Sequence, residues 1–250
     1  MSESLVALIA EAERLLIFTG AGISTGSGIP DYRGPQGVWK RRQPVYLQDF
    51  MASQEARVEY WDYKLEGWAA FRDAAPNATH RAVVDLERAG KIELVVTQNV
   101  DGLHSAAGTS DERLVEIHGS NRAVRCLDCE AEADPQATYD AFAKTQQPPR
   151  CSECDGWLKP ATISFGQSLR QIDLERAAAG AAAADAVIAL GSSLSVTPAA
   201  NIPLMAAQRG APYAIVNRGE TEHDPLSVVT VRLDGDVGEL FVAAVRQAIG

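Results

Sequence analysis

The chain predicts an α/β fold, in which a Rossmann-like parallel sheet carries helices on both faces and is interrupted by two insertions. Short apolar runs alternate with amphipathic stretches of helical spacing, a pattern typical of parallel sheets covered on both faces. A glycine-rich segment directly follows the first apolar run, as in sheets that bind phosphate groups. The alternation breaks at residues 36–75 and 121–159, where we expect a helical insertion and a small module that contains all four cysteines.

Composition and charge limit the class of protein. With 250 residues, 46% of them hydrophobic, the chain can form one large domain, or one domain with a smaller module inserted. A net charge of −10 makes a broad electrostatic contact with nucleic acid unexpected. No apolar stretch reaches the roughly 18 residues of a membrane span, and the first residues lack the basic region of a signal peptide. We therefore expect a cytoplasmic protein with reduced cysteines and no membrane or nucleic-acid partner.

Apolar spacing and capping residues define the elements before residue 120. Leu5, Leu8 and Ile9 have helical spacing, and the continuous apolar run after them predicts a buried strand. Asn77 is a helix-capping residue, and Gly90 ends the helix that starts there. The expected elements are, in order, a helix at 4–14, a strand at 15–19, one or two helices within 45–74, a helix at 77–89, and strands at 92–97 and 114–117.

The same reasoning defines the elements after residue 160. They are a strand at 162–165, an alanine-rich helix at 174–184, a strand at 186–190, a helix that opens at Thr197-Pro198, strands at 213–217 and 228–233, and a last helix capped by Asp236 with Glu239. We accordingly assign residues 1–35, 76–120 and 160–250 to a Rossmann-like domain. Residues 36–75 and 121–159 are expected to form a small domain.

Two Cys-x-x-Cys pairs enclose residues 130–150. Cys126 pairs with Cys129 and Cys151 with Cys154, and the chain has no further cysteine. Four thiolates in two such turns match tetrahedral zinc. Free buried cysteines or a redox pair would explain one Cys-x-x-Cys, but not two with no cysteine to spare. Because the protein would fill all four positions, we predict one zinc ion with a structural role.

The glycine-rich segment has more chemistry than a phosphate loop requires. Gly20-Ala21-Gly22 lets backbone N–H groups come close to a phosphate, because glycine has no Cβ. Thr25 stands at the third glycine position of the generic dinucleotide fingerprint, and no acidic residue ends a second strand about 20 residues later. These departures count against a plain hydride-transfer dehydrogenase. An acid, an aromatic ring and a base then follow together at Asp31-Tyr32-Arg33.

Polar residues also follow the other predicted strands. Gln98-Asn99 and Asp101 offer amides and a carboxylate for a carboxamide or for sugar hydroxyls, and His118 can act as a general base near neutral pH. Gly191-Ser192-Ser193 and Asn217-Arg218 follow two later strands. Each cluster alone also fits a loop turn, a buried histidine or a helix cap. Because the carboxyl ends of parallel strands meet at one edge, the clusters together predict one ligand site.

Taken together, these segments resemble the sirtuins, the NAD-dependent protein-lysine deacylases. The shared motifs occur in family order from residue 15 to about residue 240, so the resemblance covers nearly the whole chain. They are Gly20-Ala21-Gly22-Ile23-Ser24, Gly28-Ile29-Pro30-Asp31-Tyr32-Arg33, Thr97-Gln98-Asn99-Val100-Asp101-Gly102-Leu103-His104, His118-Gly119, the two cysteine pairs, Phe165-Gly166, Gly191-Ser192-Ser193-Leu194 and Asn217.

The resemblance implies a reaction in which NAD is consumed. The carbonyl oxygen of an acylated lysine attacks the ribose carbon as nicotinamide leaves, and His118 then acts as general base through the ribose hydroxyls. One water molecule then completes the reaction, and the products are a deacylated lysine side chain, nicotinamide and an acylated ADP-ribose. The implied partners are acyl-lysine proteins or peptides.

The resemblance also implies the residues of the site. The catalytic residues are His118 and Asn99. Contacts to NAD are implied for Gly20, Ala21, Gly22, Thr25, Asp31, Tyr32, Arg33, Gln98, Asn99, Asp101, His118, Gly191, Ser192, Ser193, Asn217, Arg218 and Val237. Contacts to the acyl-lysine peptide are implied for Phe165, Gly166 and Val196.

Three positions depart from the family pattern. Tyr32 stands where many members have phenylalanine, and Gln167 stands where glutamate is usual. Members that favour succinyl or malonyl lysine have a Tyr-x-x-Arg pair, whereas this chain has Trp61-Asp62-Tyr63-Lys64. Lysine lacks the bidentate fork of arginine, so we expect acetyl or longer apolar acyl groups to be preferred.

Two other functions fit the same motifs. ADP-ribosyl transfer or NAD hydrolysis would use the same pocket, and a non-catalytic module would only sense NAD. A sensing module is expected to lack His118 or Asn99, and both residues are present. Deacylation needs a base at His118, so its presence favours deacylation.

Overall fold

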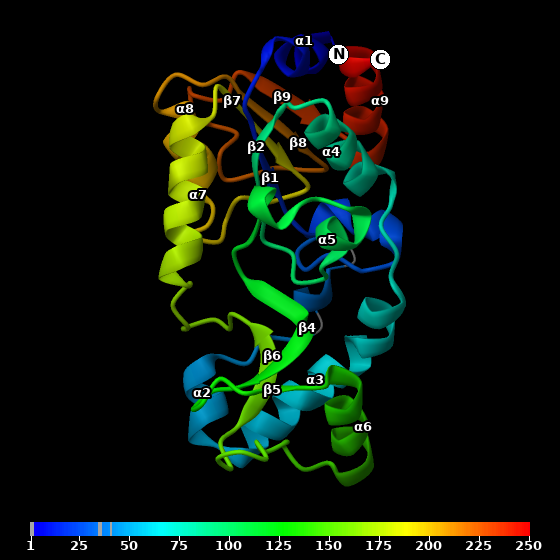
Figure 1. The fold of residues 1–250 in the computed structure, drawn as a ribbon, viewed down its shortest axis with the longest axis vertical. Coiled ribbons are helices and arrows are strands. Elements are labelled where there is room, and N and C mark those ends of the chain that lie inside the picture. Colours follow the sequence, from blue (N-terminus) through cyan, green and yellow to red (C-terminus); the bar gives the residue numbers. More distant parts are fainter. Residues whose placement is uncertain (1–2, 35–36, 41) are drawn as a thin grey trace.

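Two sheets of different size organise the molecule (Figure 1). The structure is a computed structural model that describes residues 3–34, 37–40 and 42–250. The larger sheet has six parallel strands in the order β3-β2-β1-β7-β8-β9. These strands are β1 (Leu15–Thr19), β2 (Ile92–Thr97), β3 (Leu114–Glu116), β7 (Ala186–Leu190), β8 (Tyr213–Asn217) and β9 (Val231–Asp234). The predicted Rossmann-like α/β fold is thus confirmed.

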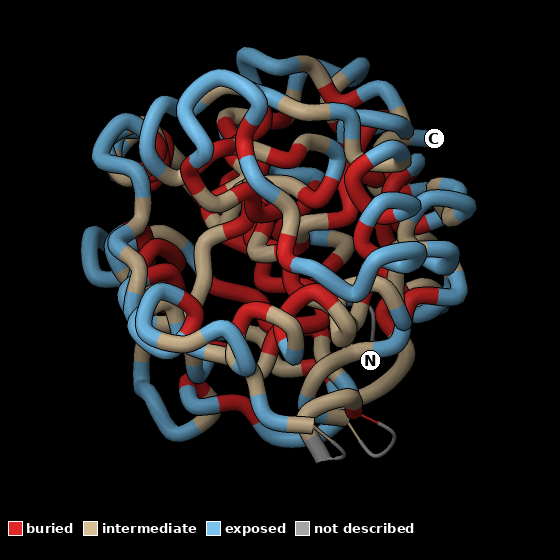
Figure 2. The backbone as a smooth tube through the Cα atoms, turned by 90° about the horizontal axis from the view of Figure 1, so that it is seen from below, coloured by how far each residue is buried: buried red, intermediate tan, exposed pale blue. Residues whose placement is uncertain are grey.

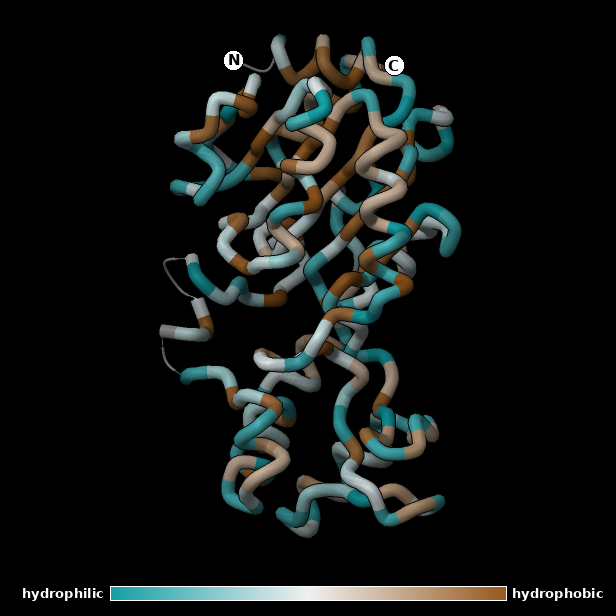
Figure 3. Tube along the Cα trace, turned by 90° about the vertical axis from the view of Figure 1, so that its left-hand side faces the viewer, coloured by the Kyte–Doolittle hydropathy of each residue, from teal (hydrophilic) through white to brown (hydrophobic). Residues whose placement is uncertain are grey.

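Helices cover both faces of this sheet. They are α1 (Glu3–Glu11), α4 (Ala78–Arg88) and α9 (Val237–Ile249) on one face, and α7 (Gln171–Ala183) and α8 (Asn201–Ala207) on the other. All five residues of β1 are buried, and successive side chains point to opposite faces. Leu15 and Ile17 join the first core and Leu16 and Phe18 the second, so β1 stabilises two layers. Buried segments lie in the interior of the molecule (Figure 2), and many hydrophobic segments lie in the part that holds the large sheet (Figure 3).

The smaller sheet lies beyond the carboxyl ends of the large one (Figure 1). Its antiparallel strands are β4 (Gly119–Cys126), β5 (Glu132–Ala133) and β6 (Leu158–Thr162), in the order β5-β4-β6. The helices α2 (Leu47–Ala52), α3 (Gln54–Asp73) and α6 (Pro135–Thr145) share a separate aromatic core with it. Trp61, Tyr139 and Phe142 lie at the centre of that core.

Helix caps agree with the sequence. The Asn77 side chain accepts a hydrogen bond from the Thr79 N–H at the start of α4, and Asp236 accepts one from the Glu239 N–H at the start of α9. A further short helix, α5 (Leu103–Ala107), follows β2 and was not expected.

The structure corrects several expected bounds. The strand expected at 162–165 is β6, which ends at Thr162, because its pairing with β4 stops opposite Gly119. The helix expected from Thr197-Pro198 begins at Asn201. The strand expected at 228–233 is β9, whose pairing with β8 starts only at Val231.

The elements β4, β5 and α6 were not expected. The strands are only partly buried, and their pairing joins residues far apart in sequence. The α6 helix had a readable signal, since Asp134 caps it and Pro135 occupies its first turn. The boundary expected between residues 35 and 36 lies outside the described residues, and the division into domains stays a prediction. Within the described ranges, every helix is too short or too polar to reach across a bilayer.

Candidate active site

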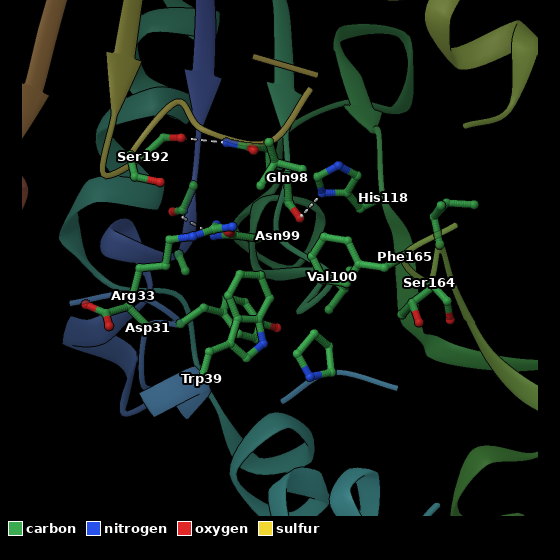
Figure 4. A pocket seen from close by; sticks show the side chains of 18 of the residues that line it. Asp31, Arg33, Trp39, Gln98, Asn99, Val100, His118, Ser164, Phe165 and Ser192 are labelled. Atoms are coloured by element: carbon green, nitrogen blue, oxygen red, sulfur yellow. Dashed lines mark hydrogen bonds between the residues drawn. The ribbon is translucent and has the colours of Figure 1, made fainter. Parts of the chain in front are cut away.

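A cleft of about 760 Å³ lies at the carboxyl ends of the parallel strands (Figure 4). Its walls are the loops after β1, β2, β7 and β8, together with residues 31–34, Trp39, residues 44–45 and the segment that follows β6. Most of the predicted site residues line it. They are Gly20, Ala21, Gly22, Asp31, Tyr32, Arg33, Gln98, Asn99, His118, Phe165, Gly166, Gly191, Ser192, Ser193, Val196, Asn217 and Arg218.

Three predicted residues do not form part of this wall. The Thr25 hydroxyl donates to the Gly22 carbonyl at 3.0 Å, within the loop itself. Asp101 is buried behind Asn99, where its carboxylate accepts from the Ser24 hydroxyl at 2.7 Å and from the Leu103 N–H at 2.9 Å. Val237 is buried in the core at the start of α9, because its apolar side chain turns toward the sheet.

The glycines after β1 are required by the loop after β7. A Cβ on Gly20 would lie 2.7 Å from the Gly191 carbonyl oxygen, and a Cβ on Gly22 would lie 2.8 Å from the Gly191 Cα. The N–H groups of Gly20 and Gly22 donate to the carbonyls of Leu190 and Gly191. Within the described part of the chain, the N–H groups of Ala21, Ser192 and Ser193 have no hydrogen-bond acceptor and can bind an anion.

Asn99 is held rigidly at the edge of the cleft. Its side-chain amide donates to the Gly20 carbonyl and to the Ser24 hydroxyl, both at 3.1 Å, and its backbone N–H donates to the Thr97 hydroxyl at 3.0 Å. The side-chain carbonyl of Asn99 remains for a ligand. A donor on that ligand, such as a carboxamide, suits this oxygen.

His118 lies two residues beyond β3 and faces the cleft (Figure 4). Its Nδ1 lies 3.1 Å from the Gln98 carbonyl oxygen, which can only accept, so Nδ1 holds the proton and Nε2 has a free lone pair. Burial lowers the pKa of His118 below its ordinary 6.5, although the bond to Gln98 partly opposes this. At neutral pH the ring is therefore uncharged and can accept a proton at Nε2.

An aromatic strip closes one side of the cleft. The rings of Tyr32 and Trp39 lie 4.9 Å apart between centroids, and those of Trp39 and Phe165 lie 5.3 Å apart. The Arg33 guanidinium stacks over Trp39 at 4.3 Å. The strip joins the loop after the glycine-rich segment to the segment after β6, so both belong to one wall of the cleft (Figure 4).

The floor of the cleft comes from α3. Tyr60, Tyr63 and Lys64 line it, and Lys64 Nζ lies 3.5 Å from Asn121 Oδ1. Burial lowers the pKa of Lys64 to about 8, and burial lowers that of nearby Lys159 to about 7. Neither lysine forms an ion pair with a carboxylate of the described residues.

The four cysteines meet at the tip of the small sheet. Their sulfur atoms all lie within 4.8 Å of one another, with Cys126 to Cys154 at 3.5 Å and Cys129 to Cys151 at 3.7 Å. Sulfur atoms around a tetrahedral zinc with Zn–S bonds of ~2.3 Å lie about 3.8 Å apart. The cluster therefore has the size and the donor set of a zinc site.

Comparison with known proteins identifies the family. Residues 20–198 match the Sir2 family, and this range is more than half of the chain. The chain belongs to the Sir2 family. It is 44% identical to the NAD-dependent protein deacetylase 1 of Bradyrhizobium diazoefficiens, over 95% of this chain and 92% of that protein. It is 41% identical to the NAD-dependent protein deacetylase of Rhodopseudomonas palustris, over 95% and 93%.

Solved structures of Sir2 proteins share the whole architecture. A Sir2 complex with a p53 peptide and NAD+ superposes with a TM-score of 0.88 at 35% identity, over 99% of this chain and 98% of that chain. A Sir2 protein bound to a propionylated peptide superposes with a TM-score of 0.86 at 34% identity, over 98% and 97%. The Rossmann-like sheet and the small cysteine-containing part are thus Sir2 features.

Several cleft residues of this Sir2-family chain were not predicted. They include Trp39, Pro44, Val45, Tyr60, Val100, Ile163, Ser164, Pro198 and Glu220. Trp39, Pro44, Val45 and Tyr60 lie away from the strand ends, and nothing in their local sequence distinguishes them from core or loop residues. The other five had a usable signal, since each lies within three residues of a residue that was predicted.

Proposed function

We propose that this Sir2-family chain is an NAD-dependent protein-lysine deacylase, which transfers the acyl group of an acylated lysine to ADP-ribose and releases nicotinamide. The observation that carries the proposal is His118, which points an unprotonated Nε2 into the same cleft as Asn99 and the glycine-rich loop. The similarity to proteins named NAD-dependent protein deacetylase supports it. So does the similarity to Sir2 structures with a p53 peptide and NAD+ and with a propionylated peptide.

The cleft fits NAD. The unpaired N–H groups of Ala21, Ser192 and Ser193 would hold the two phosphates, and Asn217 and Glu220 lie where they can bind sugar hydroxyls. The Asn99 side-chain carbonyl would accept from the carboxamide of nicotinamide. Bound NAD supplies an electrophilic ribose carbon and nicotinamide as the leaving group. Thr25, Asp101 and Val237 would support the site from behind its wall.

The protein groups then act on protons and on water. His118 Nε2 would accept a proton from a ribose hydroxyl, so that this oxygen can attack the acyl carbon. Asp31, Tyr32 and Arg33, closed by Trp39, would exclude water while the glycosidic bond breaks. Burial raises the pKa of Tyr32, so its phenol stays neutral and adds no charge at this wall.

The acyl-lysine would enter between Phe165-Gly166 and Val196. Both segments line the cleft outside secondary structure, so a peptide can pair with their backbone as an added strand. Lys64 lies at the floor as a single ammonium group, already beside Asn121 and the Tyr60 ring. Because it lacks a bidentate fork, we propose that acetyl and longer apolar acyl groups are preferred over acidic ones.

The cysteine cluster would hold one structural zinc ion, since all four positions are protein thiolates. We further propose a cytoplasmic location, because four free thiols close together persist in a reducing compartment.

Product analysis tests the function. Peptides with acetyl-, butyryl- and succinyl-lysine are incubated with the protein and NAD, and the products are identified and quantified by mass spectrometry. We expect deacylated peptide and acylated ADP-ribose from the first two peptides, and at least tenfold less of both products from the third. ADP-ribosylated peptide would indicate a transferase, free ADP-ribose with intact peptide a hydrolase, and no turnover a sensing module. Each of these three results would contradict the proposed function.

A further inference from the structure

Two buried histidines lie behind the cleft, outside the residues that line it. His80 of α4 and His104 of α5 are 0% and 2% exposed, and their rings are 5.0 Å apart between centroids. The Nε2 of His80 and the Nδ1 of His104 are buried without a hydrogen-bond partner among the described residues. Such atoms cost free energy unless they are paired.

Hydrogen bonds on the outer sides of the two rings fix their tautomers. The Asn77 N–H donates to His80 Nδ1 at 3.3 Å, so the proton of His80 is on Nε2. The Thr19 hydroxyl gives its proton to the Thr97 hydroxyl at 2.8 Å, so it accepts from His104 Nε2 at 3.1 Å. His104 therefore has its lone pair on Nδ1. The Nε2–H of His80 is therefore an unused donor, and the Nδ1 of His104 is an unused acceptor.

The opposite set of protons is unfavourable. If Thr19 donated to His104 Nε2, the proton of His104 would be on Nδ1 and two N–H donors would face each other in the interior. Both rings are also uncharged at neutral pH. Burial lowers the pKa of His80 to about 4 and that of His104 to about 3. Asp101 and Arg81 act in opposite directions on His80, and His80 lowers the pKa of His104.

The ring spacing suits a direct bond. Two imidazoles joined by an N–H···N bond of about 2.9 Å have centroids roughly 5 Å apart, which is the spacing here. The planes are inclined by 68°, and an N–H···N bond does not require the two rings to be coplanar.

The pair would close a ring of hydrogen bonds around the glycine-rich segment. On one side, the Asn77 amide donates to the Ile23 carbonyl at 2.7 Å and to the Ser27 hydroxyl at 3.0 Å. On the other side, the Asn99 amide donates to Gly20 and Ser24, and its backbone is tied to Thr97. A hydrogen bond joins Asn77 to His80. Two more join Thr97 to Thr19 and Thr19 to His104.

We propose that His80 Nε2–H donates to His104 Nδ1 and that this bond, as the last link of the ring, positions Asn99 for the reaction. The inference rests on the proposed function for its effect on catalysis, but not for the bond itself. His80 and His104 are positioning residues, since neither lines the cleft.

Nitrogen NMR of the whole protein with ¹⁵N-labelled histidine tests the bond directly. The chain has four histidines, so the spectrum is simple. We expect one N–N coupling between two neutral rings, absent from His80→Asn and from His104→Gln. No such coupling in the wild type, or a proton on His104 Nδ1, would overturn the proposal.

Kinetics test the positioning role. Asn at position 80 keeps an acceptor for Asn77, and Gln at position 104 keeps a donor for Thr19, so each variant removes only the shared link. We expect each to lower kcat/KM for NAD roughly tenfold, and the double variant to be no worse than either. Thr109→Val, which alters another buried hydroxyl without a partner, should change kcat/KM less than twofold.

The outcomes separate the histidine bond from the proposed function. If the decreases in kcat/KM of the single variants multiply to about 100-fold in the double variant, the two histidines act independently and the proposed link is overturned. If the wild-type protein deacylates no peptide, the proposed function is contradicted, and the NMR result still decides whether the bond exists.

Discussion

At the scale of single residues, one hydrogen bond sets the chemistry of the cleft. The Gln98 carbonyl fixes the tautomer of His118, and burial keeps the ring neutral. The base is therefore ready before any ligand binds. Sequence placed His118 after a strand, but only the structure shows which nitrogen is free.

Substitution of His118 tests this role. His118→Ala should keep the fold and lower the rate of deacylation by about 10²–10⁴-fold, because a positioned general base contributes about that much. The amount of deacetylated peptide formed from an acetyl-lysine peptide measures this rate. His223→Gln is the control, since His223 lies outside the cleft beside the Tyr213 hydroxyl and should not be needed for turnover. Full activity of His118→Ala would refute the assigned role.

The pH profile gives a second test at this scale. The base works only when neutral, and burial places its pKa below 6.5. We expect kcat/KM to be constant near pH 7 and to fall tenfold per pH unit only below a midpoint under 6.5. Initial rates across pH 5–8 measure this limb. A midpoint above 6.5, or a limb that persists in His118→Ala, would contradict the expectation.

At the scale of elements, four continuous apolar runs were predicted with the same first and last residues that the structure shows. The strands β1, β2, β7 and β8 are such runs, and burial on both faces makes them readable. The β6 strand was misplaced because Pro160 interrupts its pattern, and β4 was missed because only three of its eight residues are buried. Pairing between segments that are far apart in the chain stabilises these two strands, and this pairing cannot be predicted from the local sequence.

Metal removal tests the cysteine cluster at this scale. Metal analysis should find one zinc per chain, and chelation should lower the Tm by at least ~10 °C, equivalent to about 4 kcal/mol. The effect should extend to the cleft, because the Leu47 N–H at the start of α2 donates to the Phe165 carbonyl at 2.9 Å. Thermal unfolding before and after chelation measures it. Folded protein without metal and with an unchanged Tm would refute a structural zinc.

At the scale of the whole molecule, the site exists because two separate cores meet at one sheet edge. The strand-end residues were predictable, since parallel strands must end together. Phe165-Gly166 after β6 and Lys64 of α3 could be named only from the family resemblance, because their place in the cleft depends on how the small sheet sits above the large one. Val237 was implied by the family resemblance alone, and its side chain belongs to the core, so a role at the site stays a prediction.

The ratio of two products tests the central claim most directly. Acetyl-lysine peptide and NAD are mixed with the wild-type protein, and deacetylated peptide and nicotinamide are quantified in the same sample by mass spectrometry. Deacylation by acyl transfer predicts one nicotinamide for each peptide deacetylated, with an equal amount of acetylated ADP-ribose. Nicotinamide release without deacetylated peptide, or deacetylation without NAD, would contradict the claim.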